Sequence, residues 1–126
     1  MSDKVIKGFS PNVNLWLDVK ANVELDIISG VYEYGKRMPT IKQLADIYSI
    51  GETTAQKILD SLVDDEIITK IHGKGYFVKM YVKDTLLSAH KEELKTRSLA
   101  LAKYGKRLSI GKDEFVDIIG AAYDSD

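Results

Sequence analysis

The chain of 126 residues has no cysteine and only two histidines. The absence of cysteine excludes disulfides, thiolate nucleophiles and cysteine-based zinc sites. His72 and His90 are far apart in the sequence, and neither has a second ligand suited to a transition metal three or four residues away. We therefore expect no metal site, and nothing in the sequence calls for a cofactor.

Long apolar runs are also missing. No segment approaches the roughly 18 consecutive apolar residues that a membrane-spanning helix needs. The N-terminus has no charged-then-apolar signal pattern. We expect a cytoplasmic protein without a membrane partner.

Recognisable catalytic patterns are lacking as well. No glycine-rich phosphate loop opens a helix, and no serine elbow occurs. The adjacent acids Asp64, Asp65 and Glu66 point in different directions at helical spacing, so they are expected to end a helix rather than to bind magnesium. We expect that the chain is not an enzyme.

The chain has no excess of charge of either sign, because 18 basic and 19 acidic residues leave a formal net charge of −1. Taken over the whole chain, this balance argues against a nucleic-acid partner. Between residues 31 and 79, however, the cations cluster at the starts of helical patterns and on a predicted hairpin, whereas acids gather from Asp60 to Glu66. Such a segment can present a basic face, since association depends on the field within about 8 to 10 Å.

Apolar spacing and turn signals predict the elements of the chain. Helices are expected from Leu15 to about Ser29, with Gly30 as a left-handed cap, and over 41–48, where Thr40 and Gln43 form a capping-box pattern. Further helices are expected over 52–65, 83–104 and 112–123, with Gly105 as the stop of the fourth. The strands 67–71 and 76–80 should form a hairpin. The fold class is therefore mainly α with a small β-hairpin.

Four sequence blocks carry a resemblance to a known family. They are Arg37-Met38-Pro39-Thr40, Lys42-Gln43-Leu44-Ala45, Gly51-Glu52-Thr53-Thr54-Ala55-Gln56 and Gly73-Lys74-Gly75-Tyr76-Phe77-Val78. In order and spacing they resemble the winged helix-turn-helix domain of the GntR family of bacterial transcription regulators. The resemblance implies a DNA-binding domain over 1–80, with a loose arm over 1–11. The remainder, 81–126, resembles the dimerising two-helix tail of the YtrA-like subfamily.

The resemblance also implies roles for single residues. Arg37 is similar to the family arginine that grips phosphate, and the helix start at Thr40 can offer backbone N–H groups to another phosphate. Lys42 replaces an arginine and loses its bidentate fork. Lys74, between Gly73 and Gly75, would form the wing tip near the minor groove. The other DNA-binding residues expected on the wing are Lys70 and His72.

The third helix departs from the family pattern. Gly51 replaces a serine and Glu52 replaces an arginine, so Glu52 either caps the helix or accepts a hydrogen bond from cytosine N4. Gln56 is able to pair with adenine, although it can equally be solvated helix surface. The same two alternatives hold for Lys57. The other expected groove-facing residues are Thr53 and Thr54.

The resulting prediction is a sequence-specific regulator, acting as a repressor, whose homodimer binds an inverted repeat in double-stranded DNA. Two third helices would enter major grooves about 34 Å apart. Whether a small-molecule effector is a further partner stays open, because no ligand pocket can be inferred from so short a tail. The alternatives are a winged helix used for protein assembly without DNA, and a tail that packs on its own domain. Otherwise the tail dimerises through Leu86, Leu87, Leu94, Leu101, Phe115 and Ile119.

Overall fold

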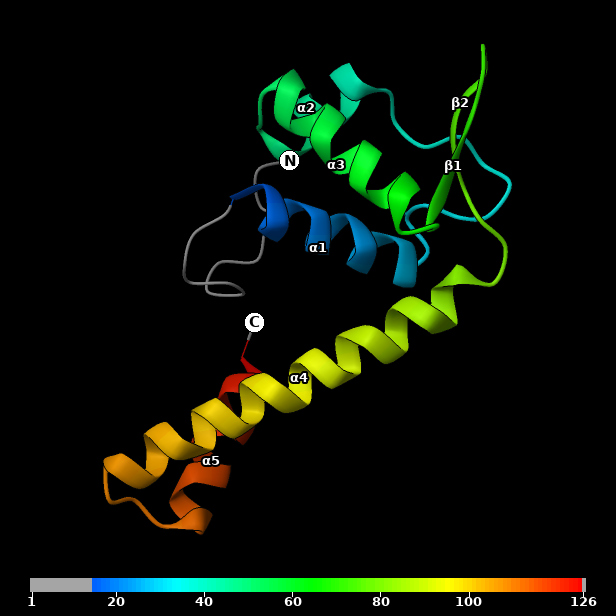
Figure 1. Ribbon diagram of the computed structural model, residues 1–126. Coiled ribbons are helices and arrows are strands. Elements are labelled where there is room, and N and C mark those ends of the chain that lie inside the picture. The colour runs from blue at the N-terminus through cyan, green and yellow to red at the C-terminus, as the bar shows by residue number, and fades with distance from the viewer. Residues whose placement is uncertain (1–14, 126) are drawn as a thin grey trace. The chain divides into compact units, whose positions relative to one another are not determined.

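The computed structural model describes residues 15–125, so the arm expected over 1–11 lies outside the described residues. The chain divides into two compact units, the first ending at Leu87 and the second starting at Ser88. The elements, shown in Figure 1, are α1 (Leu15–Ile28), α2 (Ile41–Tyr48), α3 (Glu52–Asp64), β1 (Ile68–Ile71), β2 (Gly75–Val78), α4 (Val82–Arg107) and α5 (Lys112–Asp124). The predicted fold class, mainly helical with one hairpin, is confirmed.

Local signals in the sequence explain where α1 and α2 begin and end. Gly30 adopts the left-handed conformation with φ of 88° just after α1, where a side chain would be strained. At the start of α2, the Thr40 hydroxyl accepts from the Gln43 backbone N–H (3.2 Å), and Oε1 of Gln43 accepts from the Thr40 backbone N–H (2.9 Å). These reciprocal bonds form the predicted capping box.

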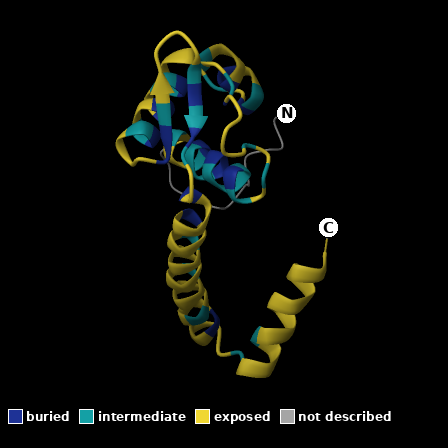
Figure 2. Cartoon of the chain, turned by 90° about the vertical axis from the view of Figure 1, so that its right-hand side faces the viewer, coloured by how far each residue is buried: buried dark blue, intermediate teal, exposed yellow. Residues whose placement is uncertain are grey.

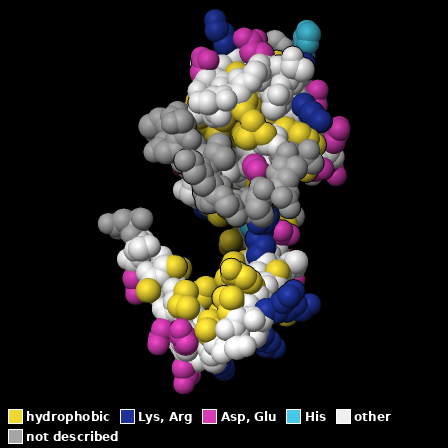
Figure 3. All heavy atoms as spheres, turned by 90° about the vertical axis from the view of Figure 1, so that its left-hand side faces the viewer, with side chains coloured by type: hydrophobic (Ala, Val, Ile, Leu, Met, Phe, Trp, Pro, Cys, Tyr) yellow, Lys and Arg dark blue, Asp and Glu magenta, His cyan; other side chains and the backbone are white. Residues whose placement is uncertain are grey.

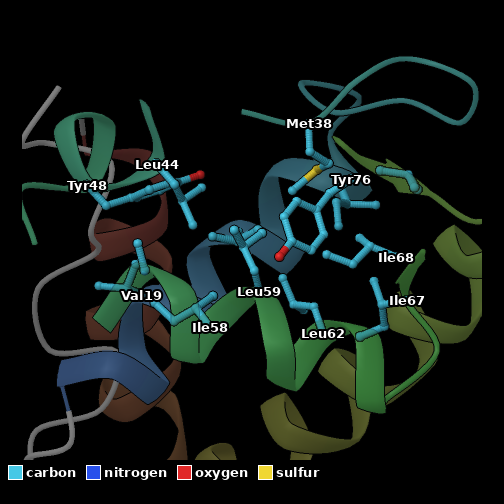
Figure 4. Close-up of a cluster of buried hydrophobic side chains, with 14 of the residues drawn as sticks. Val19, Met38, Leu44, Tyr48, Ile58, Leu59, Leu62, Ile67, Ile68 and Tyr76 are labelled. Atoms are coloured by element: carbon cyan, nitrogen blue, oxygen red, sulfur yellow. The ribbon is translucent and has the colours of Figure 1, made fainter. Parts of the chain in front are cut away.

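The core of the first unit lies among the first three helices and the hairpin. The apolar side of α3, formed by Ala55, Ile58, Leu59 and Leu62, is fully buried. Figure 4 shows side chains from α1, α2 and the hairpin around this helix. Burial of such side chains is the main driving force for folding, at roughly 25 cal/mol per Å² of apolar surface. α3 is therefore packed into the core on one side, while Glu52, Thr53 and Lys57 on its other side are exposed.

The hairpin is antiparallel, with Ile68 opposite Val78 and Ile71 opposite Gly75. The segment before α2 is joined to the hairpin by backbone contacts. The Met38 amide donates to the Tyr76 carbonyl at 2.8 Å, and Arg37 forms an isolated antiparallel β-bridge with Phe77. The strands are shorter than predicted and do not include Met80. The turn, the second strand and Arg37 thus form one connected structure.

A partly buried polar network links α1 to α2. The Tyr48 hydroxyl donates to Asp26 Oδ2 at 2.6 Å and lies 2.9 Å from the Tyr32 hydroxyl. Burial, followed by the bond to Asp26, raises the pKa of Tyr48 far above its ordinary value, and burial is also the main cause of the raised pKa of Tyr32. Both hydroxyls therefore stay protonated and connect the two helices at neutral pH.

Helix α4 corrects two sequence-based predictions. Leu86 was expected in a dimer contact, but with Val82 it is buried in the core of the first unit, because the first turn of α4 still packs there. Gly105 was expected to stop the helix, yet α4 continues to Arg107. A Cβ at Gly105 would lie 2.6 Å from Cδ1 of Phe115, so this glycine allows α5 to approach α4 closely.

Candidate nucleic-acid interface

The outer side of α3 is accessible. Glu52, Thr53 and Lys57 are exposed, Thr54 is half-buried, and the buried residues occupy the opposite side of the helix. Gly51 is the N-cap and provides no side-chain hydrogen bond, so the helix starts without a hydroxyl or carboxylate cap. An accessible helix beside a hairpin is the arrangement by which winged helices enter a major groove.

Arg37 lies against the wing, which is the hairpin of β1 and β2 with the turn between them. A Cβ at Gly75 would be 3.5 Å from Cγ of Arg37, and the φ of 117° at Gly75 strains any side chain. The glycine therefore gives the arginine stem room to cross the hairpin, while Arg37 itself remains exposed. The structure thus brings together two residues that are separated in the sequence and that were both predicted to contact DNA.

The wing carries two exposed lysines, Lys70 and Lys74. His72, Gly73 and Lys74 form the turn, which is closed by a bond of 2.9 Å from the Lys74 amide to the Ile71 carbonyl. The Lys70 ammonium lies 5.8 Å from the centre of the Tyr76 ring. This cation–π contact holds the Lys70 side chain on the hairpin, and Lys70 nevertheless remains exposed to solvent.

The start of α2 offers fewer phosphate-binding amides than the sequence suggested. The capping box uses the amides of Thr40 and Gln43. The first hydrogen bond within the helix runs from the Leu44 backbone amide to the Thr40 carbonyl at 2.8 Å. The backbone amides of Ile41 and Lys42 come before it and have no acceptor within the helix, so these two are left for a phosphate. The exposed Lys42 side chain adds a positive charge at this end.

Two residues predicted to face the groove make contacts inside the protein. The Lys57 ammonium lies 4.4 Å from the centre of the Trp16 ring, so this lysine is directed toward α1. The Gln56 amide nitrogen donates to Asp60 at 2.8 Å and lies 3.4 Å from the Tyr76 hydroxyl. Trp16 and Tyr76 were not among the predicted site residues, because only the folded chain brings them beside α3. Asp60 was not among them either, although it lies within α3, four residues after Gln56.

The acids at the end of α3 are partly neutralised. Lys20 pairs with Asp65 at 2.5 Å, and Lys79 lies 3.7 Å from Glu66. By contrast, Glu52 and Asp60 are exposed on the outer side of α3. The field near this helix is therefore mixed, with cations on the wing and at the start of α2.

Residues 15–125 contain no group of three or more His, Asp or Glu side chains placed to hold a metal ion. Among the described helices, none is both long enough and apolar enough to cross a membrane.

The second unit exposes an apolar surface formed by α4 and α5, which is visible in Figure 3. α5 has no buried residue, and Leu94, Leu101 and Ile119 are 63%, 43% and 39% exposed. A hollow of about 400 Å³ is lined by Phe115, Val116, Ile119, Gly120, Tyr123 and Asp124. Leu87, which ends the first unit, is exposed as well.

Comparison with known proteins agrees with this geometry. The model of the gntR family of bacterial regulatory proteins matches residues 15–78. A probable fructoselysine utilization operon transcriptional repressor of Escherichia coli K12 is 33% identical over 75 residues, which are 59% of this chain and 31% of the repressor. The chain thus spans about a third of the length of this curated relative.

Solved structures share the fold. A GntR family transcriptional regulator from Listeria monocytogenes superposes with a TM-score of 0.70 at 19% identity, over 90% of this chain and 98% of that one. YtrA from Sulfolobus acidocaldarius, a GntR-family transcription factor, gives 0.50 at 22% identity, over 92% and 93% of the two chains.

The exposed α3, the helix α2 before it and the hairpin of β1 and β2 after it define a winged helix-turn-helix protein of the regulatory class. More particularly, the chain belongs to the gntR family of bacterial regulatory proteins. This family consists of regulators, which agrees with the expectation that the chain is not an enzyme.

Proposed function

We propose that this protein is a transcriptional repressor that binds double-stranded DNA sequence-specifically in the cytoplasm. The observation that supports this most is the accessible side of α3 beside the wing, where Lys74 at the wing tip and Arg37 against the wing are both exposed. In this arrangement α3 reads base edges in the major groove, while the wing and the start of α2 contact phosphates.

We further propose that the protein acts as a homodimer through its tail, over residues 88–125. The exposed apolar side chains of α4 and α5 support this, because a monomer would leave them in water. A symmetric dimer presents two copies of α3, so the operator would be an inverted repeat with half-sites about 34 Å apart.

A small-molecule effector has a place in this proposal. The first unit has a cavity of about 260 Å³, whose wall includes Tyr32, Tyr34 and Tyr81. Its volume is slightly below the roughly 300 Å³ at which ordinary ligand pockets begin, so only a small molecule would fit. Tyr32 also belongs to the polar network of α1 and α2.

Selection of bound fragments from random duplexes tests this function directly. We expect an enriched inverted repeat, and affinity for it that falls steeply as salt rises, since each neutralised phosphate contributes about −0.9 to the log–log slope. Failure to enrich any duplex would contradict the proposal. Enrichment of a single unpaired half-site would contradict the dimer and leave DNA binding intact.

The second candidate is a protein-assembly module. Glu52 and Asp60, exposed on the outer side of α3, favour it, because acids near phosphates weaken DNA binding. This function predicts no salt-dependent binding to any duplex, whereas the repressor predicts a steep slope. The same titration therefore separates the two candidates.

A further inference from the structure

The side chain of Gln56 is held from two sides. Its Nε2 donates to Oδ1 of Asp60, one helical turn further along α3, at 2.8 Å. The same nitrogen lies 3.4 Å from the hydroxyl of Tyr76, on β2 of the wing. Tyr76 is itself almost fully buried beside Leu59 and Leu62, as Figure 4 shows. These two contacts therefore fix the orientation of the Gln56 side-chain amide.

The partners of Gln56 decide which end of its amide faces outward. A carboxylate only accepts hydrogen bonds, so the end of the amide beside Asp60 must be its NH₂ group. Both amide hydrogens then have acceptors within the protein, and Oε1 is the group left for an incoming partner. Asp60, which is bonded to this amide, is exposed and adds its own accepting oxygens. The Gln56–Asp60 pair therefore offers hydrogen-bond acceptors to a partner.

An accepting surface discriminates among bases. A glutamine that reads adenine donates from NH₂ to N7 while its oxygen accepts from N6, and here that donor is already engaged. Guanine and thymine present acceptors at this edge and would be repelled, whereas cytosine presents its N4 amino group. Cytosine is the base whose edge complements Oε1 together with a carboxylate.

We propose that Gln56 and Asp60 together read the amino group of a cytosine in each half-site. Gln56 accepts from N4, Asp60 is the positioning residue that fixes the amide, and Tyr76 supports the same orientation from the wing. This inference rests on the proposed function, since it requires α3 to lie in a major groove. It replaces the adenine pairing that the sequence alone suggested for Gln56.

The test is random-duplex selection with the full chain and three variants. Gln56→Ala identifies the position concerned, because preference there should disappear. Asp60→Ala releases the NH₂ group, so preference at that position should move from cytosine toward adenine, changing the ratio of the two affinities by about tenfold. Asp64→Ala is the matched control, since Asp64 is an exposed acid one turn further along α3. It should strengthen binding to all duplexes alike and leave the ratio unchanged.

The outcomes separate this inference from the proposed function. If the wild-type chain enriches no duplex, DNA binding itself fails and this inference fails with it. If a duplex is enriched but adenine is already preferred at the Gln56-dependent position, the inference is overturned while the repressor function stands. Equal changes in base preference from Asp60→Ala and Asp64→Ala would also overturn the inference and leave the repressor function standing.

Discussion

The two units of this chain bury their apolar side chains to very different degrees, as the colours of Figure 2 show. The first unit encloses a core that extends from Val19 to Leu86. In the second, Gly105 is the one buried residue between 88 and 125. The first unit therefore has a core of its own, whereas the second leaves most of its apolar surface exposed.

The largest effect is expected in the core of the first unit. Leu59→Ala removes a fully buried side chain of α3 and should lower the free energy of unfolding by about 3 kcal/mol, through lost burial and the cavity left behind. The exposed Leu99→Ala in α4 should change it by less than about 0.5 kcal/mol. Urea denaturation measures both. Equal losses would mean that the two units do not differ as described.

A charge on the tail surface should break the dimer. Leu94 and Leu101 lie on the same side of α4 as Gly105, with seven residues from Leu94 to Leu101 and four from Leu101 to Gly105. Leu94→Glu should convert the protein to a monomer in analytical ultracentrifugation and weaken operator binding about 100-fold, because avidity is lost. Leu99→Glu, on another side of α4, is the control and should stay dimeric. A dimeric Leu94→Glu protein would place the interface elsewhere.

The contact between α4 and α5 depends on Gly105. Gly105→Val should destabilise the second unit by about 2 kcal/mol, because a Cβ there would lie 2.6 Å from Phe115. The double variant Gly105→Val with Phe115→Ala should recover part of this loss, since the ring that clashes is gone. Thermal unfolding followed by circular dichroism provides the measurement. Independent, additive effects of the two substitutions would contradict close packing at this position.

The smallest effect concerns Arg37, which lies against the wing. Arg37→Ala should weaken binding to all duplexes by about 1 kcal/mol and make the log–log salt slope shallower by about one, because one phosphate contact is lost. Base preference should not change. Fluorescence anisotropy on the selected operator and on unrelated DNA supplies the comparison. A loss confined to the operator would instead assign Arg37 to base reading.

Several features were predictable because their causes are local. The capping box of Thr40 and Gln43, and the glycine after α1, act over a few residues, so the sequence indicated them correctly. The helix and hairpin boundaries of the first unit were predicted to within a few residues for the same reason. The order of these elements, together with Arg37 and the wing glycines, was enough to indicate a DNA-binding fold.

Other features depended on packing between distant residues. Apolar periodicity placed Leu86 on a helix face but did not say that this face meets the core of the first unit. Gly105 resembled a helix stop because the ring of Phe115, ten residues later, is close to it only in the folded chain. Likewise, Trp16 beside Lys57 and Tyr76 beside Gln56 are neighbours without any sequence signal.

The amino-acid sequence by itself determined the helices, the hairpin and the family, because hydrogen bonds, caps and apolar periodicity operate within a few residues of one another. Only the tertiary structure decided which groups of α3 and the wing remain available to a partner. Packing brings together side chains that lie far apart in the sequence, and their mutual contacts set the direction of each donor and acceptor.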